Sequence, residues 1–590
     1  SQSRDRKGQE MMESILGIDL GTTNSEVSII KNGKPEIIPI DGENLMPSCV
    51  ALDTKGQLII GRVAKNQMAV NPASTILSIK RKMGSSEKVL LGDKMFSPEE
   101  ISAFILRKLA RSAQEYLGQE VTKAVITVPA YFDENQRKAT KNAGILAGLE
   151  VVRIINEPTA AALAYKLDHT DNRNILVYDL GGGTFDVSIV IIENGVVEVK
   201  SSHGNTSLGG DDFDNLLINH VVDAFKEKHG IDLLEDLTSK YRLWNSVEKA
   251  KKELSDNQVT RINEEFISGN LHLSMEITRE TFDEIVVQLI DNTMNSVHKA
   301  LKDALLLPKA VDIIILAGGS TRSPIITRKL EKIFGKPPVQ AINPDLIVTM
   351  GAAIQGGVIA GYETHSVLID ITPYTFGTSA VGEVHGELVY NKYVPIINRN
   401  STVPVEKSDI FTTMTDFQKI VEVRIFQGEN PIADDNKLIG NFLVENLSDV
   451  PAGNRIQLKL KLDLNGMLIV TAEELDTGLS KTVRMETSGE TEQFNLKKAQ
   501  QNISSISMDE EIESESIFTS ADKTDNKKIL LQAKSLRKRA ESLLNSVDKV
   551  DANEITDLLN KSKTAIIEKD MFELEEINNS LSDMLFYLED

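Results

Sequence analysis

The sequence predicts a multidomain protein with a duplicated α/β domain, an all-β sandwich and a helical C-terminal segment. Over the first 360 residues, short β-branched runs alternate with amphipathic helical patterns, as in α/β folds. Residues 15–30 and 175–190 are identical at eight of sixteen positions, at a constant offset of 160 residues. Residues 372–487 contain mainly strand and turn patterns, whereas the chain after 488 lacks proline altogether.

The α/β region contains clear candidates for buried strands and for helices. Residues 123–130, 174–180 and 312–319 are apolar runs rich in β-branched residues, which predicts buried strands. Residues 97–118 begin with a Ser-Pro-Glu-Glu helix start and end at Gly118. Because the two similar stretches each begin such a unit, we expect two lobes related by a pseudo-two-fold axis.

The regions after residue 372 have other spacings of apolar residues than the α/β region. Residues 456–464 alternate strictly between apolar and polar side chains, and the Asn-Gly pair that follows predicts a hairpin with a return strand at 468–472. The spacing of apolar residues over 529–547 and 554–588 predicts an antiparallel helical bundle.

Composition excludes several classes of protein. The net charge of −22 argues against a nucleic-acid partner, because such proteins usually carry a basic excess. The single cysteine, Cys49, excludes an internal disulfide, and no apolar run is long enough to span a membrane. We therefore expect a soluble, cytoplasmic protein with no nucleic-acid or membrane partner. Residues 1–11 are expected to be a tag or a disordered start.

Each repeated stretch places an aspartate at a strand end, directly before a glycine turn. Glycine lets backbone N–H groups approach a phosphate, and a carboxylate there can hold a hydrated cation. Two facing hairpins would grip a polyphosphate, with Asp19 and Asp179 flanking one Mg²⁺ and with threonine hydroxyls as donors. A buried strand that ends in an ordinary turn is the alternative, which two copies in register disfavour. Dinucleotide and P-loop motifs are absent.

Further segments resemble the seventy-kilodalton heat-shock chaperones of the DnaK type. They are VITVPAYFDENQRKAT, RIINEPTAAALAY, SLGGDDFDN, EKAKKELS, LAGGSTRSP, INPDLIVTMGAAIQGG and VLID, and the resemblance spans about residues 12–590. It implies an actin-like ATPase domain of two ribonuclease-H-like lobes at 12–363 and an interdomain linker at 364–371. A β-sandwich peptide-binding domain at 372–487 and an α-helical lid at 488–590 complete the implied arrangement.

The resemblance also implies roles for residues of the ATPase domain. Asp19, Glu157 and Asp179 hold Mg²⁺ through water, with K⁺ ions beside it. Lys80 steadies the γ-phosphate and the attacking water, Thr184 lies at the γ-phosphate, and Asp186 is a further K⁺ and water partner. The implied nucleotide-binding residues are Gly21, Thr22, Thr23, Asn24, Gly181, Gly182, Gly183, Gly209, Gly210, Glu248, Lys251, Lys252, Ser255, Gly318, Gly319, Ser320, Arg322 and Asp345. Among these, Glu248, Lys251, Lys252 and Ser255 share one helix face, and Arg322 stacks on adenine opposite Lys252.

Two further sets of residues follow from the resemblance. The implied peptide cleft comprises Thr378, Val381, Phe411, Met414, Val421 and Val423, with simple core packing as the alternative for each. The implied coupling residues are Pro129, Arg137, Val367, Leu368, Ile369 and Asp370. An apolar segment between domains is unexpected in a plain tether, so we expect it to dock as an added strand or in an apolar groove.

The implied function is that of an ATP-dependent molecular chaperone. Its cofactors would be ATP/ADP, Mg²⁺ and K⁺, and its partners unfolded or nascent polypeptides, a J-domain co-chaperone and a GrpE-type nucleotide exchange factor. The C-terminal LED favours a bacterial-type cytoplasmic member. A binding module that scarcely hydrolyses ATP and a small-molecule kinase are the rival hypotheses.

The sequence departs from the family pattern in four places. Glu26 stands where a small residue is common, and Phe417 replaces a usual asparagine. Ser366 shortens the apolar linker, and residues 382–397 include an insertion of about eight residues beside the implied cleft. These departures leave the expected ATP binding intact but put client preference and coupling strength in question.

Overall fold

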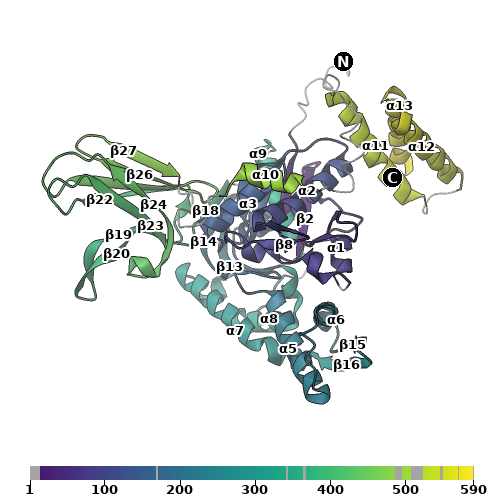
Figure 1. Cartoon of the computed structure of the whole chain (residues 1–590), viewed down its shortest axis with the longest axis horizontal. Helices are drawn as coiled ribbons and strands as arrows, with labels where there is room; N and C mark the ends of the chain where they lie inside the picture. The colour runs from purple at the N-terminus through teal and green to yellow at the C-terminus, as the bar shows by residue number, and fades with distance from the viewer. Residues whose placement is uncertain are drawn as a thin grey trace.

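A computed structural model describes residues 13–68, 70–167, 171–339, 343–362, 367–484, 494–506, 523–544, 549–568 and 571–588. The expectations for residues 1–11, for Ser366 and for the domain joints at 363–366 and 485–493 lie outside these residues. Figure 1 shows an α/β body at the centre, a β sandwich on one side and a group of helices on the opposite side.

The first lobe of the body is built on a sheet with the order β11-β10-β1-β2-β3. Strand β1 pairs in parallel with β10 and antiparallel with β2, so the first stretch of the repeat forms the β1–β2 hairpin. Helices α2 and α3 cover one face of this sheet, and α4 and α9 cover the other. The bounds are β1 Ile15–Asp19, β2 Asn24–Lys31, β3 Lys34–Ile37, β10 Lys123–Val128, β11 Glu150–Asn156, α2 Pro98–Leu117, α3 Glu134–Leu146, α4 Glu157–Leu167 and α9 Ile347–Ile359.

Short elements complete this lobe around its edge. They are β4 Met46–Pro47, β5 Val50–Leu52, β6 Leu58–Ile60, α1 Arg62–Gln67, β7 Thr75–Ile76, β8 Val89–Leu91 and β9 Lys94–Phe96. The predicted helix at 97–118 is confirmed as α2. Ser97 Oγ accepts from the Glu100 N–H at 3.3 Å, Glu100 Oε2 accepts from the Ser97 N–H at 2.7 Å, and Gly118 ends the helix with φ 64°. This reciprocal cap satisfies backbone donors that the first turn would otherwise leave free.

The second lobe repeats the arrangement of the first. Its sheet has the order β17-β12-β13-β14-β18-β21, with β12 parallel to β17 and antiparallel to β13. Asp179 lies opposite Asp186 in the β12–β13 hairpin, just as Asp19 lies opposite Glu26 in β1–β2, so the predicted duplication is present in three dimensions. The bounds are β12 Arg173–Leu180, β13 Phe185–Glu193, β14 Val196–Asn205, α5 Gly210–His229, α6 Leu237–Asp256, β15 Val259–Ser268, β16 Leu271–Thr278, α7 Arg279–Asp303, β17 Ile313–Ala317 and α8 Pro324–Phe334.

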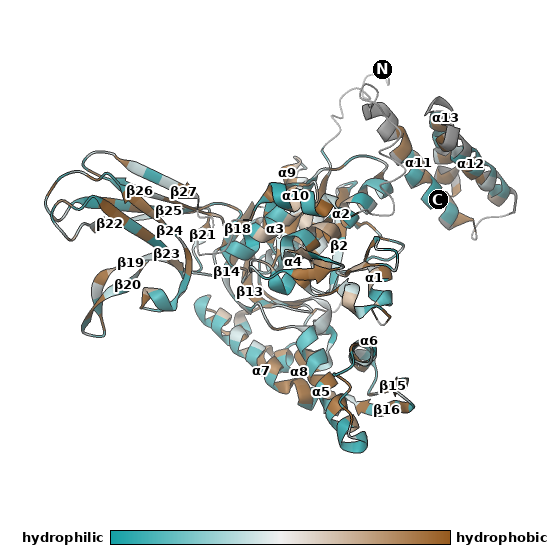
Figure 2. Ribbon diagram, in the orientation of Figure 1, coloured by the Kyte–Doolittle hydropathy of each residue, from teal (hydrophilic) through white to brown (hydrophobic). Residues whose placement is uncertain are grey.

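The sandwich consists of two four-stranded sheets, β20-β19-β23-β24 and β22-β25-β26-β27. Its core is apolar, and Figure 2 shows hydrophobic residues along the strands of both sheets. The hairpin predicted at 456–472 is confirmed as β25–β26, with Leu460 opposite Val470. The bounds of the sandwich strands are β19 Phe376–Val384, β20 Glu387–Ile397, β22 Val405–Thr412, β23 Ile420–Gln427, β24 Lys437–Glu445, β25 Arg455–Leu462, β26 Leu468–Glu474 and β27 Ser480–Arg484. The last two strands of the second-lobe sheet are β18 Val367–Ile371 and β21 Thr402–Val403.

The helical segment packs on the α/β body rather than on the sandwich. Helices α11 (Lys523–Leu543), α12 (Lys549–Glu568) and α13 (Met571–Leu588) share one apolar core, as the sequence predicts. Lys534 Nζ lies 2.9 Å from Glu115 Oε1, which places α11 along α2. In this structure the body lies between the helical segment and the sandwich (Figure 1).

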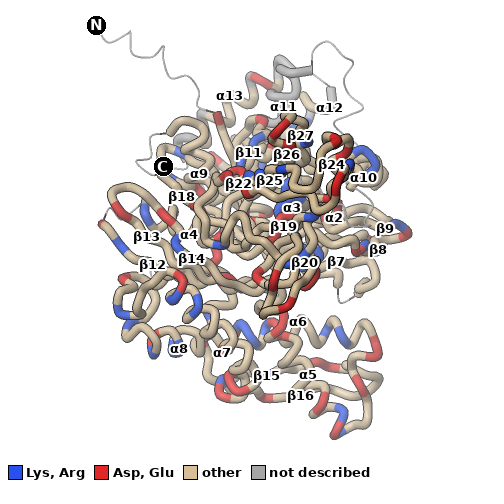
Figure 3. Tube along the Cα trace, turned by 90° about the vertical axis from the view of Figure 1, so that its left-hand side faces the viewer, with Lys and Arg blue, Asp and Glu red and all other residues tan. Residues whose placement is uncertain are grey.

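Helix α10 (Leu496–Ser504) packs on the first lobe of the body. Ala499 and Ile503 are buried in the apolar core of the first lobe, where α10 contacts α3. Among the described residues no helix is long and apolar enough to cross a membrane. Figure 3 shows acidic and basic residues interspersed along the sandwich and the body.

Candidate active site

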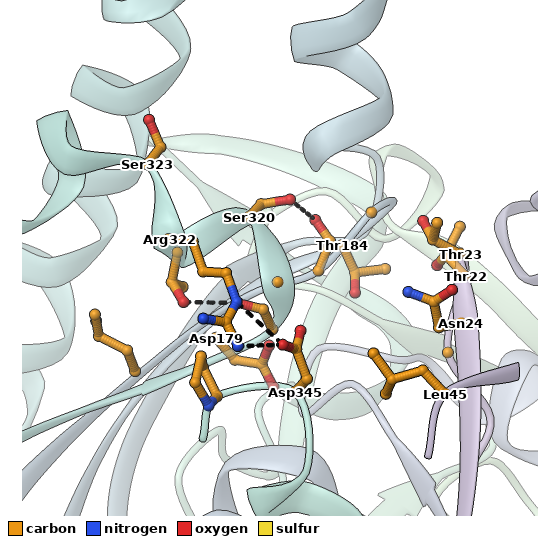
Figure 4. A pocket seen from close by; sticks show the side chains of 18 of the residues that line it. Thr22, Thr23, Asn24, Leu45, Asp179, Thr184, Ser320, Arg322, Ser323 and Asp345 are labelled. Atoms are coloured by element: carbon orange, nitrogen blue, oxygen red, sulfur yellow. Dashed lines mark hydrogen bonds and ion pairs between the residues drawn. The ribbon is translucent and has the colours of Figure 1, made fainter. Parts of the chain in front are cut away.

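A cavity of about 830 Å³ lies between the two lobes, within the usual size range of small-molecule sites. Both glycine hairpins, helix α6 and the loop after β17 line it, and Figure 4 shows side chains from both lobes turned toward one another across it. Of the residues predicted for the nucleotide site, it brings together Asp19, Gly21, Thr22, Thr23, Asn24, Lys80, Glu157, Asp179, Gly181, Gly182, Thr184, Glu248, Lys251, Lys252, Ser255, Gly318, Gly319, Ser320, Arg322 and Asp345. Gly183, Asp186, Gly209 and Gly210 lie just behind this lining; for example, the Gly210 N–H donates to the Gly181 carbonyl oxygen at 2.9 Å.

The glycine turns let the two hairpins approach closely. A Cβ on Gly182 would lie 1.7 Å from Thr23 Oγ1 of the opposite hairpin, so no other residue fits there. Gly318 combines φ 80° with a carbonyl oxygen, that of Leu180, only 2.4 Å from where its Cβ would stand. The Thr23 hydroxyl is buried and has no hydrogen-bond partner among the described residues. A buried donor without a partner, beside glycine turns whose backbone is accessible from the cavity, fits a phosphate oxygen of a ligand.

Lys80 is the cation that faces the buried carboxylates. Its Nζ lies 2.7 Å from Glu157 Oε1, and both side chains are less than a tenth exposed. Burial opposes the charged form of Lys80, but Glu157 and Asp19 outweigh it, so the pKa of Lys80 is raised. The ammonium therefore stays charged at neutral pH and can neutralise negative charge on a ligand.

The cavity floor carries more negative charge than Lys80 can balance. Burial, followed by the charges of Glu157 and Asp186, raises the pKa of Asp179 well above its ordinary value. Asp186 Oδ1 accepts from the Tyr131 N–H at 3.0 Å, and Asp19 Oδ1 accepts from the Thr127 hydroxyl at 2.7 Å. No three His, Cys, Asp or Glu side chains in the described part of the chain lie close enough to hold a metal ion directly. The carboxylates therefore fit cations that are held partly by water and by ligand oxygens, as Mg²⁺ usually is.

Helix α6 frames the other end of the cavity with ion pairs. Glu248 pairs with Lys65 and with Lys252, each at 2.7 Å. Burial alone would raise the pKa of Glu248, but the two lysines outweigh it and lower the pKa to about 2. Lys251 Nζ lies 2.7 Å from Asp214 Oδ2, so Glu248 and Lys251 are held in place.

Arg322 makes an ion pair at one edge of the cavity. Its guanidinium pairs with Asp345 and its Nη2 donates to Asn343 Oδ1 at 3.1 Å, while its side chain is half exposed. The pair closes one side of the cavity (Figure 4), and the stacking predicted for Arg322 would use the flat face of the guanidinium.

Sequence reasoning missed several charged residues in and around this site, among them Arg81, Asp212 and Lys65. Arg81 pairs with Asp212, and its buried Nε lies 2.9 Å from where a Cβ of Gly183 would stand. Its position directly after Lys80 could have indicated this role. Lys65 and Glu248 are 183 residues apart in the sequence, so no local sequence pattern predicts this ion pair.

The residues predicted to bind peptide differ from one another in burial. Thr378 on β19 is buried, and its hydroxyl donates to the Arg424 carbonyl oxygen at 2.7 Å. Val423 lies in the sandwich core, and Phe411 and Val421 pack against that core while partly exposed. Val381 is also partly exposed, whereas Met414 is 61% exposed.

The predicted coupling residues lie at the contact between the body and the sandwich. Strand β18 adds in parallel to the edge of β14, with Leu368 opposite Val197, and Leu368 packs against an apolar core of the body. The segment is therefore an added strand, one of the two forms expected from its composition.

A polar network continues from the end of β18 into the first lobe. Asp370 is buried and its Oδ2 accepts from Asn156 Nδ2 at 2.8 Å, while Asn156 Oδ1 accepts from Arg137 Nη2 at 2.6 Å. Pro129 is buried just before Tyr131, whose backbone contacts both the cavity and the sandwich.

The sandwich contacts both lobes of the body. The Tyr374 hydroxyl donates to the Tyr131 carbonyl oxygen at 2.6 Å, and the Leu468 N–H donates to Glu134 Oε1 at 2.9 Å. On the second lobe, Arg399 lies 3.0 Å from Asp303. Since the Tyr131 N–H also donates to Asp186, one residue joins a cavity carboxylate to the sandwich.

Two duplicated lobes enclose a cavity lined by glycine turns and buried carboxylates, which places the chain among two-lobed α/β proteins with a site between the lobes. Comparison with protein families is more specific. The family model described as "Hsp70 protein" matches residues 15–586, so the chain belongs to the seventy-kilodalton heat-shock protein family. Membership fits an actin-like ATPase with β-sheet and helical parts, and suggests an ATP-dependent chaperone.

Proposed function

We propose that this protein is a molecular chaperone of the DnaK type, in which ATP hydrolysis controls the binding and release of short, extended apolar segments of unfolded or nascent polypeptides. The supporting observation is the connection from the cavity to the sandwich. Asp186 accepts from the Tyr131 N–H, the Tyr131 carbonyl accepts from Tyr374, and β18 extends the sheet of the second lobe.

In this proposal, each group of cavity residues has a separate role in ATP hydrolysis. The glycine turns and the Thr23 hydroxyl donate to phosphate oxygens, and Lys80 directs its ammonium at the γ-phosphate and the attacking water. Asp19, Glu157 and Asp179 would hold Mg²⁺ through water, and Asp186 would serve a K⁺ ion and water. Bound Mg²⁺ supplies positive charge that offsets the charge developing on the transferred phosphoryl group. Glu248, Lys251, Lys252 and Ser255 frame the adenosine, with Arg322 on the opposite side.

The proposal extends to domains, partners and location. The ATPase domain comprises residues 12–363, the linker 364–371, the peptide-binding sandwich 372–487 and the lid 488–590. A J-domain co-chaperone would stimulate hydrolysis, a GrpE-type factor would exchange ADP for ATP, and the protein would act in the cytoplasm. An acidic, charged surface that contacts other proteins suits this role.

Single-turnover ATP hydrolysis, with and without an unfolded apolar peptide, tests the proposal. We expect slow basal hydrolysis that the peptide accelerates. Tight ATP binding without turnover would instead indicate a binding module. Phosphorylation of a sugar or polyol in a substrate screen would indicate a small-molecule kinase.

A further inference from the structure

Glu26 occupies the position in the first lobe that Asp186 occupies in the second. The offset of 160 residues that relates Asp19 to Asp179 also relates Glu26 to Asp186. In β1–β2, Glu26 lies opposite Asp19, and in β12–β13, Asp186 lies opposite Asp179. Directly opposed residues of antiparallel strands point to the same face of the sheet, so Glu26 and Asp19 face the cavity together.

The surroundings of Glu26 differ from those of Asp186 in one respect. Asp186 accepts a hydrogen bond from the Tyr131 N–H, whereas the Glu26 carboxyl has no hydrogen-bond or ion-pair partner among the residues that the structure describes. Glu26 is only 4% exposed, and it lines the cavity. Its neighbour two positions along, Ser28, donates to the Thr349 carbonyl oxygen at 2.7 Å, so this face of β2 is turned toward α9.

An acidic side chain that is almost fully covered, has no protein partner and lines the cavity fits a ligand that would satisfy it from the cavity. The charged groups that act on Glu26 are Asp19, Glu157 and Asp345, which are acidic, and Lys80, which is basic. Lys80 is already paired with Glu157. The missing partner of Glu26 is therefore a cation, because an anion would meet an excess of negative charge.

We propose that Asp19 and Glu26 hold a further divalent cation against the phosphates of the bound nucleotide. Mg²⁺ commonly binds through one or two carboxylates together with substrate phosphates, so two protein carboxylates suffice once the nucleotide is present. The proposal rests on the proposed nucleotide-binding function and adds a metal position to it. A bound cation would favour the charged form of this carboxylate and join it to the phosphates.

The stoichiometry of Mn²⁺ in the ADP complex tests this directly. Mn²⁺ is titrated into the full chain saturated with ADP, and free Mn²⁺ is followed by electron paramagnetic resonance. We expect two bound Mn²⁺ ions per complex for the parent and one for Glu26→Gln, which keeps the side-chain volume but removes the charge. Glu26→Asp, which keeps the charge, should retain two.

The dependence of ADP affinity on divalent cation provides a second measurement. Calorimetry with Mg²⁺ and with chelator gives a ratio of the two dissociation constants. A cation held by Glu26 would add to the attraction for the phosphates, so Glu26→Gln should lower this ratio by at least about tenfold. Glu36→Gln is the matched control: Glu36 lies opposite Ile29, on the other face of the same sheet, and its variant should keep the parental ratio.

The outcomes separate this inference from the function on which it rests. One bound Mn²⁺ in the parent would overturn the inference by itself, even if a variant failed to fold. A cation dependence unchanged by Glu26→Gln would also overturn it. Failure of the parent to bind ADP under any condition would contradict the proposed function instead.

Discussion

The cavity between the lobes and the proposed peptide cleft of the sandwich differ in how clearly each is defined. In the cavity, residues from distant parts of the chain converge on one space, and most of them are charged or glycine. In the sandwich, Thr378 and Val423 are buried, Met414 is exposed, and Val381, Phe411 and Val421 are intermediate.

The difference has a physical cause. A buried charge is costly unless it is paired or meets a ligand, so a group of buried carboxylates around one lysine marks a site. An apolar binding surface uses the same side chains as a core, so its residues are not distinguished from packing residues by type or burial. The first region is thus defined by its chemistry, whereas the second needs a binding measurement.

Removal of the Lys80 ammonium tests the cavity with the largest expected effect. Lys80→Ala should slow single-turnover hydrolysis at least about hundredfold, because the ammonium stabilises charge that develops on the γ-phosphoryl group. Nucleotide affinity should stay within a few-fold, since backbone and hydroxyl donors hold the phosphates. Lys82→Ala is the control, because Lys82 lies in the same turn with an exposed side chain paired to Glu87. Hydrolysis by Lys80→Ala at the parental rate would refute the role of Lys80.

The connection between the two regions is tested on strand β18. Leu368→Asp places a charge against an apolar core and should undock the strand, since burial of a leucine contributes roughly 1.5–3 kcal/mol. ATP-driven peptide release, followed by anisotropy, should fall at least about tenfold while basal hydrolysis is kept. Val367→Asp changes the same strand at a side chain that is 60% exposed, so a smaller loss there would show that burial of Leu368 causes the effect. Equally fast ATP-driven release from Leu368→Asp would show that the segment is only a tether.

Particular residues show which features of the fold and the site could be predicted from the sequence alone. The glycine hairpins, the caps of α2 and the β25–β26 hairpin could be predicted because neighbours within a few residues determine them. The pairing of Lys65 with Glu248 and the burial of Ile503 in the first lobe could not, because each depends on contacts between distant segments. The resemblance to a family supplied most of the remaining site residues, but Glu26, a departure from it, needed the structure to show its missing partner.

Titration of Glu134 tests the contact between the body and the sandwich. Burial, the largest cause, raises the pKa of Glu134 to about 8, and its Oε2 has no partner among the described residues. The docked state therefore binds a proton that the undocked state releases. Docking is most favourable below the ordinary carboxyl pKa and is progressively weakened as the pH rises toward 8.

Glu134→Gln, which resembles the protonated form, should therefore increase docking several-fold at pH 7 and above and flatten its pH dependence. Protease cleavage at β18, compared between variant and parent at pH 6 and pH 8.5, measures docking, and the exposed Glu150→Gln is the control. If the parent and Glu134→Gln respond alike to pH, another group governs the contact.

The smallest expected effect concerns the proposed peptide cleft, whose residues are not distinguished from packing residues by type or burial. Val421 is partly exposed beside the sandwich core, so Val421→Phe should fill the space next to it and weaken binding of an apolar peptide by a few-fold through steric overlap. Ile420→Phe is the matched control, because neighbouring residues of a strand point to opposite faces and Ile420 is 49% exposed. Peptide affinity is measured by anisotropy, with basal ATP hydrolysis as the check that the body is intact. Weakening by Val421→Phe alone would define the cleft on that face of β23. Equal weakening by both variants would indicate general disruption of the sandwich, and parental affinity in Val421→Phe would place the peptide site elsewhere.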